Sequence, residues 1–173
     1  AARLTLCVGD SAGITAAQEA AERAGTRHPV HLKVDTGMRR VGAEPAGAVA
    51  LARQIADSPS LILQGVFTHL PISDTPEGND YTRDQLARFL ATVDAIRDAV
   101  GEIPLVHAGN SGAVLGHDLA GTNLIRPGII SYGAPGPLPA TPGSRPCPSA
   151  TATATPGCLA TAAGCWPAAA PAR

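Results

Sequence analysis

Hydrophobic and polar positions alternate with two different periods along residues 1–135. Short apolar or alternating runs predict β-strands over residues 4–8, 30–35, 63–70, 104–111 and 123–133. Runs with a period of three to four residues predict helices over 12–25, 43–58 and 80–101, with a short helix over 111–116. Strands that alternate with helices pair in parallel, so the pattern predicts an α/β fold.

Local signals mark the ends of these helices. Ser11 is a residue type that can cap the first helix, and Gly25 can end it. Pro45 stands near the start of the second helix, where proline is tolerated. The third helix has a single apolar stripe made of Leu86, Phe89, Leu90, Val93 and Ile96.

The strand over residues 30–35 has two unlike faces. One is apolar and the other carries three ionisable groups: Val30, Leu32 and Val34 against His31, Lys33 and Asp35. A glycine turn and two arginines, Arg39 and Arg40, follow directly. This arrangement is typical of a strand that carries functional side chains on one of its two faces.

Residues 136–173 have a different composition, nearly all Ala, Pro, Thr, Gly and Ser, without Val, Ile or Phe. One interpretation is a disordered Pro/Ala linker. Another is GC-rich DNA translated in a wrong frame, which Cys147, Cys158, Cys165 and Trp166 favour because such residues are unusual in a linker.

The bulk composition narrows the class of protein. The 173 residues suit one domain, and a net charge of −1 argues against nucleic-acid or membrane-surface partners. No apolar run is long enough to span a bilayer, and the start does not resemble a signal peptide, so we expect a cytoplasmic protein. Cys7 lies in an apolar run and is predicted to be a core residue.

Polar residues follow the carboxyl ends of four successive predicted strands. They are Lys33, Asp35, Thr36 and Arg40; His69; His107, Asn110 and Ser111; and Arg126, Gly128 and Ile129. Each one alone is more commonly an ordinary surface or core residue. Their convergence predicts a site, because ligands of barrel folds bind at this edge.

The residue types indicate anion binding. The chain has no nucleophile-elbow, Cys-x-x-Cys or metal-ligand spacing, and no metal is expected. Ser111 and the backbone N–H groups of Gly128 and Ile129 stand where barrels bind phosphate. Arg40 and Arg126 stay charged at any working pH. A phosphorylated cofactor and a carboxylate substrate would use both features.

Four motifs then resemble the alanine racemases, pyridoxal-phosphate enzymes with a (β/α)8 TIM barrel followed by a β domain. They are "HLKVDTGMRRVG", "GVFTHLPISD", "HAGNSGAVL", which has Gly109 where alanine is usual, and "IRPGIISYG". The resemblance covers residues 1–135 and implies the second half of the barrel, followed by an irregular tail over 136–173.

The resemblance implies pyridoxal 5'-phosphate as cofactor. Arg126 would donate to its pyridine nitrogen, and His69 would contact Arg126 and the ring. Asn110 and Ser111, with the backbone of Gly128 and Ile129, complete the cofactor-binding set. Ser111 and those backbone groups would bind the phosphate.

The resemblance also implies a substrate side. Arg40 would hold the carboxylate of alanine. Lys33 matches a position that is often N-carboxylated, where the carbamate orients the arginine. The alternative is an unmodified Lys33 that pairs with Asp35 or is solvated.

Two residues of the family have no counterpart at matching positions. The family's Schiff-base lysine lies on the first barrel strand, and its second base is a tyrosine from the β domain of a partner subunit. We therefore expect no catalytic residue in this chain. The resemblance implies a piece of an alanine racemase that is inactive alone. The intact family forms homodimers and makes D-alanine for the cell wall. The alternatives are a related barrel, either a cofactor-homeostasis protein or an amino-acid decarboxylase, and a non-catalytic remnant.

Overall fold

The computed structural model describes residues 4–133, and the tail interpretations fall outside this range. Four parallel strands form one sheet in the order β1-β2-β3-β4. They are β1 (Leu6–Val8), β2 (His28–Lys33), β3 (Leu61–Phe67) and β4 (Leu105–His107). The predicted parallel α/β architecture is confirmed.

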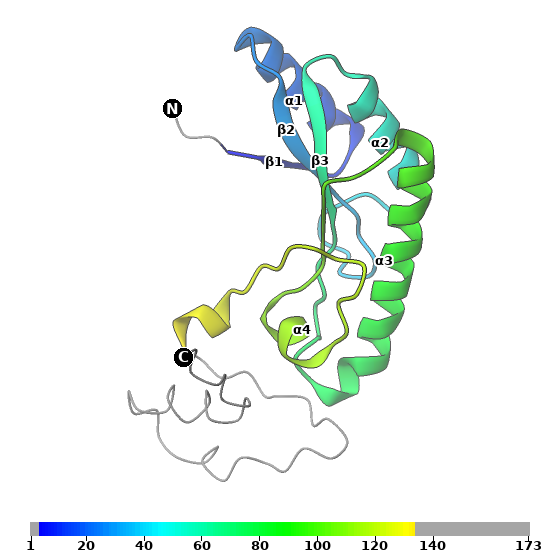
Figure 1. Cartoon of the computed structure of the whole chain (residues 1–173), viewed down its shortest axis with the longest axis vertical. Helices are drawn as coiled ribbons and strands as arrows, with labels where there is room; N and C mark the ends of the chain where they lie inside the picture. Colours follow the sequence, from blue (N-terminus) through cyan, green and yellow to red (C-terminus); the bar gives the residue numbers. More distant parts are fainter. Residues whose placement is uncertain (1–3, 134–173) are drawn as a thin grey trace, which may run out of the picture.

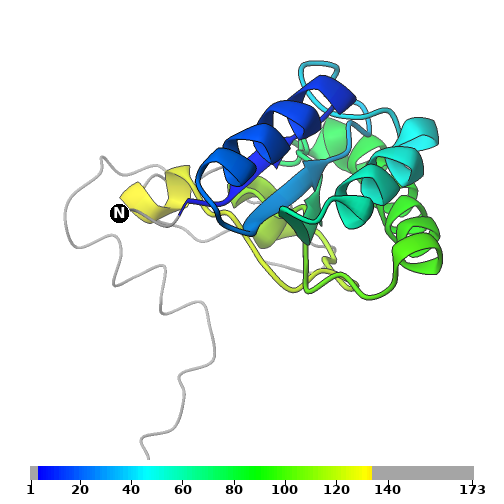
Figure 2. The same cartoon turned by 90° about the horizontal axis from the view of Figure 1, so that it is seen from above.

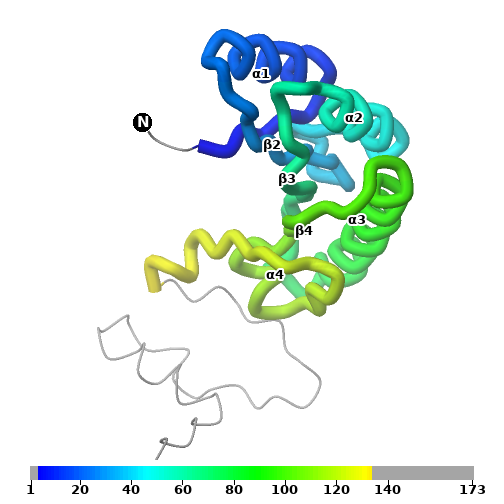
Figure 3. Tube along the Cα trace, turned by 45° about the horizontal axis from the view of Figure 1, so that its top comes forward, coloured from blue at the N-terminus to red at the C-terminus, as the bar shows by residue number. Residues whose placement is uncertain are grey.

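Helices connect the strands and cover one face of the sheet (Figures 1 and 3). They are α1 (Ser11–Arg23), α2 (Pro45–Asp57), α3 (Asn79–Val100) and the short α4 (Ser111–Gly116), with 3-10 turns η1 (Pro76–Gly78) and η2 (Ile129–Tyr132). Figure 2 shows α1 and α2 side by side over the sheet. Within residues 4–133, no helix has the length and apolar character needed to cross a bilayer.

The hydrophobic core lies between the sheet and these helices. Val30, Leu32 and Val34 of the predicted apolar face are fully buried there. The apolar stripe of α3 also faces the core, with Phe89, Val93 and Ile96 fully buried. The other face of the sheet, called the inner face below, carries His31 and Lys33, so the predicted alternation is confirmed.

The predicted start signal is confirmed for α2 and is wrong for α1. Pro45 is the first residue of α2, as predicted. Asp10, rather than Ser11, caps α1: its carboxylate accepts a hydrogen bond from the Gly13 N–H at 2.7 Å. Ser11 is already the first helical residue, and the cap must stand just before it in extended conformation.

The predicted strand over residues 123–133 is wrong beyond its first residues. Leu124 forms a single parallel bridge with His107, and the Arg126 N–H donates to the Gly109 carbonyl at 2.8 Å. Pro127 has no N–H to continue a ladder, and the chain turns into η2 directly afterwards.

The prediction that Cys7 is a core residue is also wrong, because its side chain is exposed. Cys7 pairs with His31 across β1 and β2 and therefore shares the inner face. Among residues 4–133 no helix covers that face, so an apolar strand residue there does not become buried.

Candidate functional site

Arg126 is the most firmly held side chain at the carboxyl edge of the sheet. Its Nη1 lies 2.5 Å from His107 Nδ1, and its Nη2 donates to the Thr68 carbonyl at 2.8 Å and the Ala108 carbonyl at 3.3 Å. Its guanidinium carbon lies 5.2 Å from the centre of the Phe67 ring. Burial lowers the pKa of Arg126, but a guanidinium still carries its charge at neutral pH.

His107 holds the guanidinium. His69 makes no side-chain hydrogen bond within residues 4–133, and its contact with Arg126 and the cofactor ring stays a prediction. The His107 ring stacks on Phe67, with centres 4.8 Å apart and planes 1° from parallel. Burial, then the charge of Arg126 and the neighbouring His31, lowers the pKa of His107 to about 3, so the ring is neutral at pH 7.

Ser111 and the turn at Gly128 form a second group of donors. The Gly128 N–H donates to Ser111 Oγ at 2.9 Å, and the Ile130 N–H approaches the same oxygen at 3.5 Å. The predicted contact of the Ile129 N–H is with a phosphate rather than with this hydroxyl, and it stays a prediction. A Cβ added at Gly128 would meet only Ser111 Oγ, at 3.9 Å, so the glycine leaves space beside the hydroxyl.

Asn110 has a structural role that the sequence did not predict. Its Nδ2 donates to the Leu70 carbonyl at 2.7 Å, while its Oδ1 accepts from Ser73 Oγ at 2.7 Å and from the Ala113 N–H at 3.0 Å. The amide therefore joins the loop after β3 to the start of α4. This arrangement orients the adjacent Ser111.

Asp35 does not pair with Lys33. The Asp35 carboxylate accepts from the backbone N–H groups of Gly37, Arg39 and Arg40 at 2.9–3.1 Å. Burial raises the pKa of Asp35, but these hydrogen bonds outweigh it and leave the pKa below its usual value. Asp35 thus shapes the loop that follows β2, in which Arg39 adopts a left-handed φ of 54°.

Lys33 is 6 % exposed and forms no ion pair within the part of the chain that the structure describes. Its charge, with those of Arg126 and Arg40, lowers the pKa of His69, for which burial is the largest cause. Lys33 ends β2, Arg40 lies in the loop after β2, and Arg126 lies in the segment next to β4, so all three cations stand at the carboxyl edge of the sheet. Positive charges that form no ion pair with a carboxylate among residues 4–133 suit an anionic ligand.

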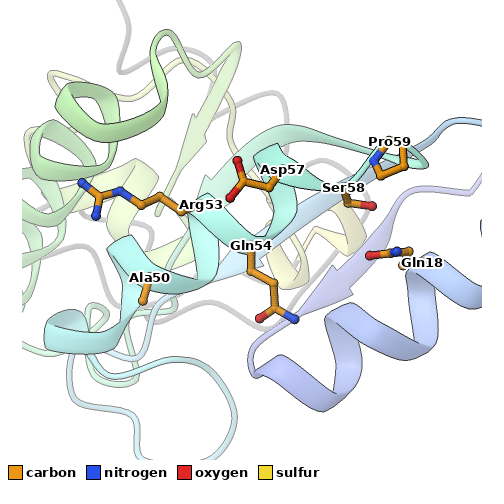
Figure 4. A pocket seen from close by; sticks show the side chains of 7 residues that line it. All are labelled: Gln18, Ala50, Arg53, Gln54, Asp57, Ser58 and Pro59. Atoms are coloured by element: carbon orange, nitrogen blue, oxygen red, sulfur yellow. The ribbon is translucent and has the colours of Figure 1, made fainter.

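A separate hollow of about 460 Å³ lies between α1 and α2, at the start of β3 (Figure 4). It is lined by Gln18, Ala50, Arg53, Gln54, Asp57, Ser58 and Pro59. None of the strand-end residues lines it, so the hollow is not part of the candidate site.

Sequence reasoning also missed the surroundings of Arg126. Thr68 and Ala108 contribute backbone carbonyls, which carry no sequence signal. Phe67 contributes a ring face and His31 contacts His107. The position of His31 on the ionisable face of its strand was the available signal.

The parallel sheet with helices over one face defines an α/β protein of the barrel type, and cationic side chains lie at the carboxyl ends of its strands. The chain belongs to the family described as alanine racemase, N-terminal domain, which matches residues 1–135.

Relatives and solved structures agree with this assignment. The alanine racemase of Cutibacterium acnes is 42% identical over 130 residues, which are 75% of this chain and 35% of the relative. The alanine racemase of Treponema pallidum is 44% identical over 106 residues, covering 60% and 28%. The chain thus spans about a third of the length of the curated relatives it matches.

Among solved structures, an alanine racemase of Clostridium difficile 630 aligns with a TM-score of 0.71 at 27% identity, covering 80% of this chain and 36% of that one. The alanine racemase of Streptomyces coelicolor A3(2) aligns with a TM-score of 0.69 at 30% identity, covering 77% and 36%. The similarity therefore extends to the fold of the described sheet and helices.

Proposed function

We propose that residues 1–135 form the cofactor-binding second half of an alanine racemase barrel, and that pyridoxal 5'-phosphate is the cofactor. The observation that carries the proposal is that a firmly held Arg126 and the Ser111–Gly128 turn stand at the same edge of the sheet. Phosphate sites of barrels lie after the last two strands, where this turn stands.

The donor set fits the cofactor at both of its ends. Ser111 and the backbone N–H groups of Gly128 and Ile129 would hold the phosphate, in the space that Gly128 leaves beside the hydroxyl. Arg126 has five N–H donors, of which three hydrogen bonds to the protein leave two for a ring nitrogen. When bound, pyridoxal phosphate supplies an electron sink for the carbanion at Cα of the amino acid.

Arg126 would limit how strongly that sink acts. A guanidinium donates and cannot be deprotonated at working pH, so it leaves a ring nitrogen unprotonated. The three contacts to His107, Thr68 and Ala108 hold the guanidinium in one orientation. A cofactor ring that withdraws electrons less strongly favours simple return of the proton to Cα, as racemisation requires.

Arg40 and Lys33 would serve the substrate side. Arg40 would bind the carboxylate of alanine with charge-assisted hydrogen bonds, each worth about 1.5–3 kcal/mol. For Lys33 we propose a carbamate, in which the neutral amine adds to CO2 and releases one proton. The modification converts a buried ammonium that has no ion-pair partner within residues 4–133 into an anion at the edge of the sheet where Arg40 and Arg126 also stand.

We assign no proton-transfer residue within residues 1–135. Racemisation needs one base on each face of a planar carbanion, and each positioned acid–base group typically contributes about 10²- to 10⁴-fold. The lysine and tyrosine that the resemblance implies would have to come from outside this segment, the tyrosine from a partner subunit in a homodimer.

Binding of pyridoxal 5'-phosphate to the full chain, followed by absorbance titration, tests the proposal. We expect binding that Ser111→Ala weakens about tenfold, since the change removes one hydrogen bond to an anion. Ser60→Ala is the matched control, because Ser60 directly precedes β3, at the amino edge of the sheet and opposite to the site. Equal affinity for pyridoxal without its phosphate would refute the assignment of the Ser111 turn.

A further inference from the structure

The sheet has an irregular register next to His31. The proposed function assigns no role to this residue. Val30 pairs with Leu63 but His31 pairs with Gly65, so the register of β2 and β3 shifts between the two positions. A Cβ added at Gly65 would lie 2.8 Å from His31 Nε2. The ring therefore occupies the space that the glycine leaves, and bulges of this kind commonly re-aim a side chain next to a site.

The hydrogen bonds from Arg126 toward His31 have only one consistent order. A guanidinium can only donate, so His107 Nδ1 must accept from Arg126 Nη1. A neutral imidazole then carries its proton on Nε2. His107 Nε2 lies 2.9 Å from His31 Nδ1, which must therefore be the acceptor.

The surroundings keep His107 in the neutral form that this order requires. Its ring stacks on Phe67 and is partly buried, and the charge of Arg126 stands at its Nδ1, so protonation of the ring is unfavourable. Protonation at Nδ1 would place an N–H against the N–H groups of Arg126. Among the described residues, the guanidinium would then have only the carbonyls of Thr68 and Ala108 as acceptors.

We propose that His31 is a positioning residue for Arg126: as an acceptor for His107 Nε2–H, it selects the tautomer whose Nδ1 lone pair faces the guanidinium. His31 acts through His107 and touches no ligand. The inference rests on the proposed function only in that Arg126 is the donor to the cofactor ring.

The test measures the tautomer directly, with the full chain labelled with ¹⁵N in its five histidines and without any ligand. Magic-angle-spinning NMR distinguishes a protonated from an unprotonated imidazole nitrogen whatever the size of the particle. We expect His107 to carry its proton on Nε2. In His31→Leu the ratio of the two His107 tautomers should fall about tenfold, the factor that corresponds to about 1.4 kcal/mol.

Two further variants keep the test independent of a damaged fold. His31→Asn can place its amide oxygen toward His107 and should retain the Nε2–H tautomer. Gly65→Ala leaves His31 in place but pushes on its ring, and should reduce the ratio as His31→Leu does. His28→Leu is the matched control, because His28 starts the same strand and should leave His107 unchanged.

A His107 ratio that is the same in His31→Leu and Gly65→Ala as in the unsubstituted chain would overturn the proposal. A parallel titration with pyridoxal 5'-phosphate separates it from the proposed function. A tautomer change in a chain that does not bind the cofactor would refute the function and leave the role of His31 standing. Cofactor binding with no tautomer change in the variants would support the proposed function and refute the role of His31.

Discussion

Replacement of Asn110 by alanine should destabilise the chain more than the loss of one exposed amide would. The side chain makes three hydrogen bonds, and two of them satisfy backbone groups, the Leu70 carbonyl and the Ala113 N–H. Leu70 and Ala113 are fully buried, so their backbone groups would have no ready access to water.

The magnitude follows from these contacts. A typical net hydrogen bond is worth about 0.5–1.5 kcal/mol, and a buried group left without a partner costs about 1–3 kcal/mol. Because Asn110 is only partly buried, water replaces some of the loss, and we expect the free energy of unfolding to fall by about 2–4 kcal/mol. That is a large fraction of the roughly 5–15 kcal/mol that stabilises a domain.

Urea unfolding followed by far-UV circular dichroism measures the effect, repeated at a tenfold dilution to separate any contribution from association. Asn79→Ala is the matched control, because Asn79 is also partly buried but its Oδ1 has no hydrogen-bond partner in the described residues. We expect a change within about 0.5 kcal/mol there. Asn110→Asp retains the acceptor oxygen but loses the donor to the Leu70 carbonyl. Its free energy of unfolding should lie between those of Asn110→Ala and Asn79→Ala. An Asn110→Ala variant as stable as Asn79→Ala would refute the reasoning.

Three further predictions concern the loop, the lysine and the open sheet. The lowered pKa of Asp35 stabilises the fold above the ordinary carboxyl pKa, and this contribution is lost as pH falls through the lower folded value. Asp35→Asn should therefore flatten the loss of stability that occurs as pH falls below the ordinary carboxyl pKa, and an unchanged slope in urea unfolding there would contradict the prediction. Borohydride reduction with pyridoxal phosphate, followed by peptide mapping, should find no stoichiometric adduct on Lys33; a full adduct would show that the role of Lys33 is misassigned. The inner face and the free edge of β1, where Leu6 is exposed, should make the chain self-associate, and a monomer in analytical ultracentrifugation would contradict this.

The chain alone should also form no D-alanine from L-alanine beyond what free cofactor gives, in an assay coupled to D-amino-acid oxidase. Under the proposed function, the residues of this segment bind and orient the cofactor and substrate, but none of them is assigned as a base on either face of Cα. Turnover well above the free-cofactor rate would show that the proton-transfer chemistry is misread.

Local sequence patterns determined the elements and their faces. The alternation from Val30 to Asp35 predicted an apolar face, and those valines and Leu32 are fully buried under the helices. The stripe of α3 and the proline at the start of α2 were likewise predicted. These features depend on periods of two and 3.6 residues and on local backbone chemistry, which neighbours along the chain suffice to set.

The candidate site was only partly predictable. The motifs marked Arg126, Ser111 and His69 as site residues, but only the tertiary structure decided what holds them. His107 and two backbone carbonyls hold Arg126, and the amide of Asn110 is used by the loop and α4. Asp35 binds its own loop rather than Lys33. A hydrogen-bond partner is set by the register between distant strands and by bulges, because a shift of one residue reverses the face of every side chain, and no local pattern encodes that register.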